Sequence, residues 1–177
     1  TLEHFVNEVA REVVDPERQV PVLERTRAVQ ATTGTEEERK EADERADLRI
    51  GALGSGSDYT PFLQHLGIAA LNLDFGGEEH YGQYHSIYDS FDHFTRFVDP
   101  DFAYGVTTAK VAARIDLRFA QSDILPFTLD RVAEVVSRYA GEVEKLADQL
   151  RKEAEERKRH LASRSFELAA DPKQPFA

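Results

Sequence analysis

The sequence predicts an α/β fold followed by a long helix. Two short apolar runs, residues 48–53 and 68–73, flank a glycine-rich turn and a helical stretch, in the order strand, turn, helix, strand. This order is typical of a βαβ unit with parallel strands. After Pro126, apolar residues recur at spacings of three and four, which is typical of a helix with one apolar seam.

The composition is that of a folded, acidic protein. The chain has 177 residues, of which 41% are hydrophobic, and its formal net charge is −11. This charge argues against nucleic acid or an anionic membrane as a partner, and no apolar run approaches the ~20 residues that span a bilayer. Cys, Met and Trp are absent, which excludes disulfides and thiolate zinc sites and favours a piece of a longer polypeptide.

The first 48 residues are expected to contain an amphipathic helix and an acidic insertion. The helix is predicted over residues 2–14, and Asp15-Pro16 ends it because the residue before proline disfavours the α region. Its apolar residues, at helical spacing, are Leu2, Phe5, Val6, Val9 and Val13. Residues 34–48 hold seven acids against three bases, so we expect a solvated insertion.

The middle of the chain supplies the predicted βαβ unit. The strand at 48–53 leads into the turn Gly54–Ser57, and Ser57 or Asp58 is expected to cap a helix over about 59–66, which Gly67 ends. The strand at 68–73 follows. The loop 74–85 then lies at the carboxyl end of this strand, where open α/β sheets bind ligands.

Two helices are predicted in the C-terminal third. The first runs from Asp99-Pro100-Asp101 to about residue 120, with one face formed by Tyr104, Thr108, Val111, Ile115 and Phe119. The second carries a seam formed by Leu129, Val132, Val136, Tyr139, Val143, Leu146 and Leu150. Such a seam must pack on another helix, of the longer protein or of a partner subunit.

The turn Gly54-Ser55-Gly56-Ser57-Asp58 has two interpretations. Its glycines allow close approach of the backbone, and the amides of a helix N-terminus can bind an anion. However, it matches neither the Walker loop, nor Gly-x-Gly-x-x-Gly, nor the Gly-x-Ser-x-Gly elbow of serine hydrolases. A structural turn and a substrate-binding turn therefore both stay open.

The loop that follows the second apolar run is rich in histidine. His80, His85 and His93 are spaced by five and eight residues and match no local zinc motif, so a solvated polar loop is one interpretation. The pair Tyr84-His85 offers a metal ligand beside a phenol that can donate to an oxyanion, and Gly82 leaves space next to it. This combination is typical of metal-assisted hydrolysis. One histidine cannot hold a catalytic zinc, so its partners must come from elsewhere, and we interpret His80 and His93 as surface or structural residues.

Three motifs carry a resemblance to a known family. Leu-Gly-Ser-Gly-Ser-Asp-Tyr at 53–59, Leu-Gly-Ile at 66–68 and Gln-Tyr-His-Ser-Ile-Tyr-Asp-Ser at 83–90 resemble the glutamate carboxypeptidase II family of zinc exopeptidases, whose non-catalytic relatives include the transferrin receptor. Asp99-Pro100 and Leu125-Pro126-Phe127 follow in the family's order. The similarity is densest over 48–127.

The resemblance implies a domain organisation. Residues 1–125 would be the C-terminal portion of a peptidase domain, with a mixed sheet flanked by helices and with 34–48 as an acidic insertion. Residues 126–177 would begin a helical dimerisation domain, which implies a homodimer. The resemblance also implies an extracytoplasmic or secreted location.

The resemblance also implies roles for individual residues. His85 corresponds to a ligand of one of two zinc ions, and Tyr84 to a phenol that hydrogen-bonds a peptide substrate. The residues expected to line the substrate cleft are Ser55, Gly56, Ser57 and Gly82. Asp89 is expected to orient the metal site.

The family's remaining ligands and its general-base glutamate lie upstream of Thr1, so this chain alone should bind zinc weakly and hydrolyse nothing. Asn72 and Asp74 stand where glutamate-specific members carry arginines, which disfavours acidic substrates. Two other functions stay open: a transferrin-receptor-like binding domain without metals, and a helical interaction module built on the seam 129–150.

Overall fold

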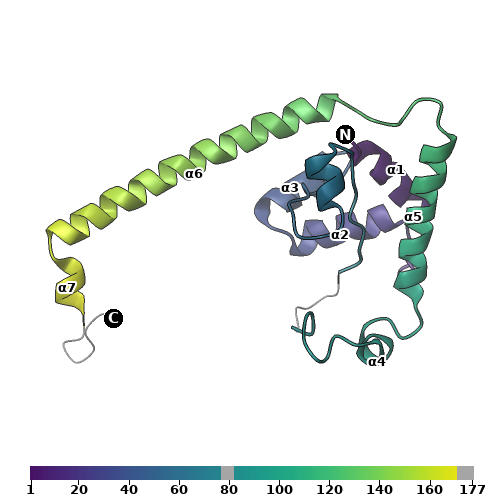
Figure 1. Cartoon of the computed structure of the whole chain (residues 1–177), viewed down its shortest axis with the longest axis horizontal. Coiled ribbons are helices and arrows are strands. Elements are labelled where there is room, and N and C mark those ends of the chain that lie inside the picture. The colour runs from purple at the N-terminus through teal and green to yellow at the C-terminus, as the bar shows by residue number, and fades with distance from the viewer. Residues whose placement is uncertain (77–81, 171–177) are drawn as a thin grey trace. The chain divides into compact units, whose positions relative to one another are not determined.

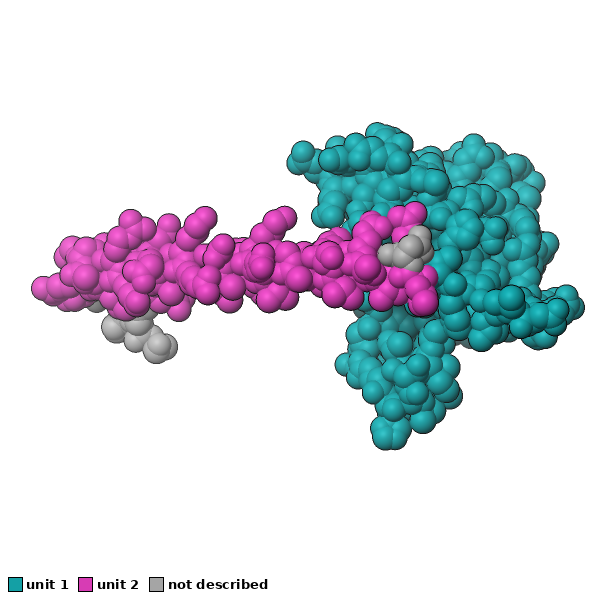
Figure 2. All heavy atoms as spheres, turned by 90° about the horizontal axis from the view of Figure 1, so that it is seen from above, with its two compact units in different colours: residues 1–128 teal, residues 129–177 magenta. Residues whose placement is uncertain are grey.

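The structure is a computed structural model that describes residues 1–76 and 82–170. The chain divides into two compact units, residues 1–128 and 129–177 (Figure 2). Assignment of these units to a peptidase domain and a helical dimerisation domain stays a prediction.

Unit 1 is built from helices and irregular segments (Figure 1). Its elements are α1 (Glu3–Glu12), α2 (Val22–Thr33), α3 (Glu36–Glu44), the π-helical turn η1 (Pro61–His65), α4 (Phe91–His93), the π-helical turn η2 (Phe94–Val98) and α5 (Ala103–Gln121). An isolated antiparallel bridge between Val14 and Pro21 closes the loop from α1 to α2.

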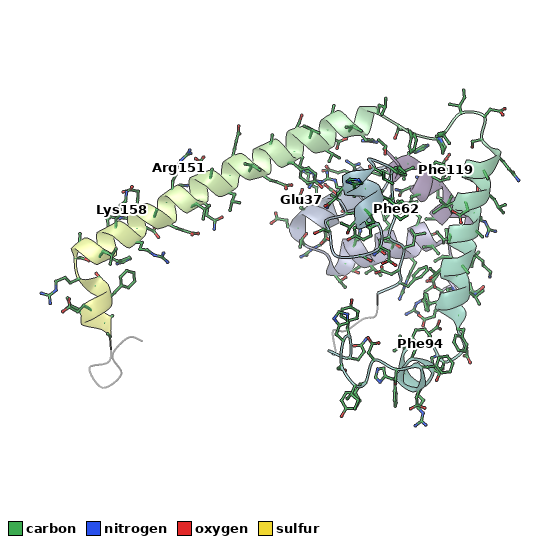
Figure 3. The ribbon with its side chains drawn as sticks, viewed as in Figure 1. Glu37, Phe62, Phe94, Phe119, Arg151 and Lys158 are labelled. Carbon is green, nitrogen blue, oxygen red and sulfur yellow. The ribbon has the colours of Figure 1, made fainter. Side chains whose placement is uncertain are left out.

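The core of unit 1 forms between α1 and α5, and both helices confirm the sequence prediction. Phe5 and Val9 of α1 are buried against Val111 and Ile115 of α5 in one cluster. The ring of Phe119 (Figure 3) meets that of Phe5 edge to face, with centroids 4.9 Å apart. Each fully buried side chain of this kind contributes about 1.5–3 kcal/mol through removal of apolar surface from water, so this cluster holds the two helices together.

The predicted α/β fold is wrong for this chain. Within residues 1–76 and 82–170 there is no strand and no sheet, and the runs 48–53 and 68–73 are irregular. Ile50, Leu71 and Leu73 pack instead against the helical core. A short apolar run specifies burial, which helices can satisfy as well as a sheet can, whereas a strand also needs a partner for its backbone groups.

The helix predicted over 59–66 is shorter and is π-helical. η1 begins at Pro61, and neither Ser57 nor Asp58 caps it, because its first turn has no side-chain cap. Gly67 ends it as predicted, with a φ of +68°. The amide of Ile68 donates to the carbonyl of Phe62, six residues earlier, at 2.9 Å, which closes the end of this π-helical turn.

The acidic segment 34–48 forms α3, and most of its side chains are exposed. Thr35 and Glu38 make a capping box, in which the Thr35 hydroxyl accepts from the Glu38 amide and the Glu38 carboxylate accepts from the Thr35 amide. Ala42 and Leu48 are buried and pack on Leu23 of α2. The segment is therefore anchored at its C-terminal end.

Unit 2 consists of α6 (Asp130–Ala162) and α7 (Ser165–Ala169). The long helix confirms the prediction from the apolar spacing. Its seam residues, from Leu129 to Leu150, are 36–74% exposed in the described chain. Beyond the seam α6 is highly charged, and Arg151 and Lys158 project from it into solvent (Figure 3). None of the described helices combines the length and the apolar character that a membrane span requires.

Candidate functional site

The turn Gly54–Ser57 is held by two side chains that follow it. The hydroxyl of Thr60 accepts hydrogen bonds from the amides of Gly56 and Ser57, at 3.0 and 3.4 Å. Gln64 donates from Nε2 to the carbonyl of Gly54 at 2.6 Å. Two of the amides that could bind an anion are thus paired with Thr60. Sequence reasoning missed this residue, although a threonine three or four positions after a Ser/Gly turn is a typical partner for such amides.

The side chains of the same turn remain available for contact with a ligand. Ser55 and Ser57 are exposed, and Gly56 has a φ of +106°, which favours glycine because a Cβ would be strained there. The turn can therefore offer hydroxyl groups to a ligand, whereas the amides of Gly56 and Ser57 hold its shape.

The second loop, residues 82–90, is a compact series of turns. The carbonyl of Gln83 accepts from the amide and from the hydroxyl of Ser86, at 3.0 and 2.6 Å. The amide of Tyr88 in turn donates to the Ser86 hydroxyl at 3.1 Å. Gly82 opens the loop with a φ of +70°. These bonds give the loop a defined shape without a regular helix or strand.

Tyr84 and His85 form a stacked pair within this loop. Their ring centroids are 3.8 Å apart and their planes are inclined by 21°. Tyr84 is 73% exposed, and His85 is exposed too. An exposed imidazole can coordinate a metal, and an exposed phenol can donate a hydrogen bond to a ligand.

His85 has a left-handed backbone conformation, with a φ of +58°. This conformation is uncommon for residues other than glycine. Its amide donates to Oδ2 of Asp89 at 3.2 Å, and the amide of Asp89 donates back to the Ser86 carbonyl at 3.1 Å. The role of Asp89 in orienting a metal site stays a prediction; in the structure its carboxylate contacts the backbone of His85 and stabilises this turn. Uncommon backbone conformations that the surroundings maintain are enriched at functional sites.

The other two histidines of this stretch lie outside the loop 82–90. His80 lies outside the described residues. His93 is on α4, where its ring lies 5.3 Å from that of Phe97. Its amide donates to the hydroxyl of Ser90 at the start of that helix.

The fit of a metal ion to these residues is incomplete. Among residues 1–76 and 82–170, no group of three or more His, Asp or Glu side chains could hold a metal. A catalytic zinc typically takes three protein ligands, and His85 could supply one. The described residues therefore contain at most one side of such a site.

Asp99 is a further polar residue that fixes the local fold. It is buried, and its two carboxylate oxygens accept from the amides of Tyr104 and Gly105, at 3.3 and 2.8 Å. These amides belong to the first turn of α5, where a carboxylate is favoured by the helix dipole. The motif Asp99-Pro100 thus marks the start of α5.

The comparisons with known proteins agree with the resemblance. The chain is 37% identical over 95 residues to the probable glutamate carboxypeptidase LAMP1 of Arabidopsis thaliana, covering 54% of this chain and 13% of that protein. It is 31% identical over 96 residues to the aminopeptidase NAALADL1 of Rattus norvegicus, covering 51% and 13%. A probable glutamate carboxypeptidase of Arthroderma benhamiae is 36% identical over 93 residues, again covering 51% and 13%.

These similarities confirm the resemblance to glutamate carboxypeptidases for about half of the chain. The matched region spans 13% of the length of each of these relatives. No family model matches the chain, and no solved structure matches it. The chain is thus similar to a segment of a family of peptidases.

Proposed function

We propose that this chain, similar over half its length to glutamate carboxypeptidases and aminopeptidases, is a segment of a zinc-dependent exopeptidase. The longer protein would hydrolyse peptides with two zinc ions, most of whose ligands lie outside this chain. The observation that carries the proposal is the exposed, stacked pair Tyr84-His85 on a compact loop. These are the two residues to which the family resemblance assigns direct roles.

His85 would be a metal ligand, and its backbone supports this role. Two hydrogen-bonded turns around His85, one of them to Asp89, restrict the position of its Cα. A ligand on a preorganised loop binds a metal with less loss of conformational entropy than one on a loose chain. Bound zinc would activate water and polarise the scissile carbonyl.

Tyr84 would donate a hydrogen bond to the substrate near the reacting carbonyl. Its ring is held by the stack with His85, so its hydroxyl keeps a defined position relative to that imidazole. The hydroxyls of Ser55 and Ser57, with Gly56 and Gly82 leaving room for a backbone, would line the substrate cleft. The amides of Gly56 and Ser57 play no part, because Thr60 accepts from both.

The helix α6 would contribute to a homodimer. Its seam residues are exposed along about six turns of helix, counted at 3.6 residues per turn. An exposed seam of this kind favours pairing with another helix. The partner helix would belong to a second copy of the protein.

The test uses the longer protein that contains this segment, with zinc measured by elemental analysis and peptide hydrolysis by kcat and KM. His85→Gln should reduce bound zinc from two ions to about one and lower kcat by at least about 100-fold, since metal activation is lost. Tyr84→Phe should leave zinc unchanged and lower kcat by about 10²-fold with little change in KM, as expected for a transition-state donor.

His65→Gln is the matched control, because His65 is an exposed histidine on η1 without an assigned role. It should leave zinc content and kcat unchanged. Full activity of His85→Gln would refute the role of His85. A longer protein that binds no zinc and cleaves no peptide would favour a non-catalytic binding domain. The 177-residue chain by itself should bind zinc weakly, so stoichiometric zinc in it would contradict the proposed division of the ligands.

A further inference from the structure

A buried carboxylate attaches residues 45–48, which follow α3, to α1. Asp47 is 5% exposed. Its Oδ1 accepts a hydrogen bond from Arg11 at 2.7 Å, and its Oδ2 lies 2.8 Å from Nδ1 of His4. His4 and Arg11 are spaced i, i+7 on α1, so the same face of this helix presents both cations.

Other contacts of this segment do not depend on His4. The side chain of Asn7 pairs with the backbone of Leu48, and Arg45 forms an ion pair with Glu3 at 2.6 Å. The Ala46 carbonyl also accepts from Arg11 at 3.0 Å and from Arg27 of α2 at 2.8 Å. The segment therefore stays attached when His4 loses its proton, but with one contact weakened.

The charges that face His4 favour its protonated form. The hydrogen bond with Asp47 is the main cause that raises the pKa of His4 above its usual 6.5, and the negative charges of Asp47 and Glu8 add to it. Glu8, on α1, lies 3.6 Å from Nε2. Partial burial and Arg11 act in the opposite direction. On the facing segment, the charge of Arg45 is paired with Glu3.

We propose that His4 and Asp47 form a pH-dependent latch that fastens residues 45–48 to α1 when His4 is protonated. Residues 45–48 continue directly into 48–53 and the turn Gly54–Ser57. The latch therefore fixes the position of residues 45–48, from which the segment that carries this turn begins. Its existence does not depend on the proposed peptidase function, because it rests on contacts within unit 1.

The direction of the pH dependence follows from the two pKa shifts. His4 has a raised pKa, so its contribution to stability is complete below about 6.5 and is lost as the pH rises through its folded-state pKa. Asp47 has a lowered pKa, through its bonds with His4 and Arg11, so its contribution is present above about 3.8 and is lost as the pH falls. The latch is thus closed in mildly acidic solution and weakens as the pH rises above about 6.5.

The experiment is an NMR titration of the 177-residue chain, combined with amide hydrogen exchange of residues 45–48 corrected for the intrinsic pH dependence. The pKa of His4 should lie above 6.5. The protection of these amides should fall as the pH rises above about 6.5, by up to about tenfold for each unit by which that pKa is raised. In His4→Gln the protection should equal that of the unmodified chain at high pH, and it should be independent of pH in this range.

His160→Gln, on α6, is the matched control and should behave like the unmodified chain. A His4 pKa at or below 6.5 would overturn the proposal. The same fall in protection in His4→Gln as in the unmodified chain would overturn it too. His4 is half exposed, and the titration of the unmodified chain tests the latch even if the variant folds poorly.

Discussion

Asn7 on α1 forms a reciprocal pair of hydrogen bonds with the backbone of Leu48, 41 residues further along the chain. Its Nδ2 donates to the Leu48 carbonyl and its Oδ1 accepts from the Leu48 amide, both at 2.8 Å. The same side chain donates to the Glu3 carbonyl. Leu48 was predicted to begin a strand. Asn7 thus hydrogen-bonds both backbone groups of Leu48, which in a sheet would pair with a neighbouring strand.

Asn7→Ala should destabilise unit 1 by about 2–4 kcal/mol, because it leaves the buried amide and carbonyl of Leu48 without partners. Asn7 is 2% exposed, so water cannot replace it without rearrangement. Urea denaturation of the 177-residue chain would measure the change. Asn72→Ala, at an exposed asparagine, should shift the midpoint little. Equal effects of the two substitutions would show that the Asn7 pair does not stabilise the fold.

Tyr104→Phe should cost about 1–2 kcal/mol, because the Tyr104 hydroxyl donates to Oδ2 of Asp15 at 3.2 Å and Asp15 is 1% exposed. Asp15 keeps its bonds from the amides of Glu17 and Arg18, which limits the loss. The same denaturation experiment measures it. Tyr88→Phe, at an exposed tyrosine, is the control and should be neutral.

The alkaline titration of Tyr104 gives a second measurement of the same contact. Burial, followed by the negative charge of Asp15, raises the pKa of Tyr104 to about 12. The protonated form is favoured in the folded state, so the stability linked to this group falls as the pH rises from about 10 to about 12. Absorbance should show one tyrosine that ionises last, and Tyr104→Phe should remove that step. Its persistence in the variant would assign it to another tyrosine.

Val136→Asp should disrupt association through α6, because it would bury a carboxylate in the interface that we propose. Val136 lies near the middle of the seam and is 61% exposed in the described chain. Sedimentation equilibrium should show the dimer dissociating at concentrations at least about tenfold higher than for the unmodified chain, which corresponds to about 1.4 kcal/mol.

Ser137→Asp adds the same charge one residue away, outside the seam, and should leave the dimer intact. If the unmodified chain is monomeric at all concentrations, or if Val136→Asp associates as before, the seam is not a dimer interface.

The helices could be predicted from the sequence because their signals are local. In α1 and α5 the apolar residues recur at helical spacing, and the same positions, such as Val9 and Ile115, are buried. Gly67 likewise marked the end of η1, since its positive φ is an intrinsic preference of glycine. Each of these signals is contained within one or two turns of chain.

The predicted strands failed because their signal was not local. Leu71 and Leu73 of the second run are partly buried and pack against the core, whereas Ile68 is 52% exposed. What buries them is decided by α1 and α5, which lie far away in the sequence. An apolar run cannot specify whether its backbone groups will meet another strand.

The roles of the candidate site residues stay predictions. The position in the loop and the family resemblance indicate Tyr84 and His85, and the structure stacks their rings. The structure adds two contacts that the sequence analysis does not contain. Thr60 accepts from the amides of Gly56 and Ser57, and Asp89 accepts from the amide of His85. The exact geometry of both contacts depends on the path of the backbone.

The sequence by itself determined the positions of α1, α5 and α6 and the likeness to a segment of glutamate carboxypeptidases. Only the tertiary structure decided that Ile50, Leu71 and Leu73 pack on helices, and that His4, Arg11 and Asp47 meet. Periodicity and motifs record local preferences, whereas hydrogen bonds such as that between Asn7 and Leu48 join residues 41 positions apart. Such contacts arise only when the entropy of closing the intervening chain is offset by the packing of the whole unit.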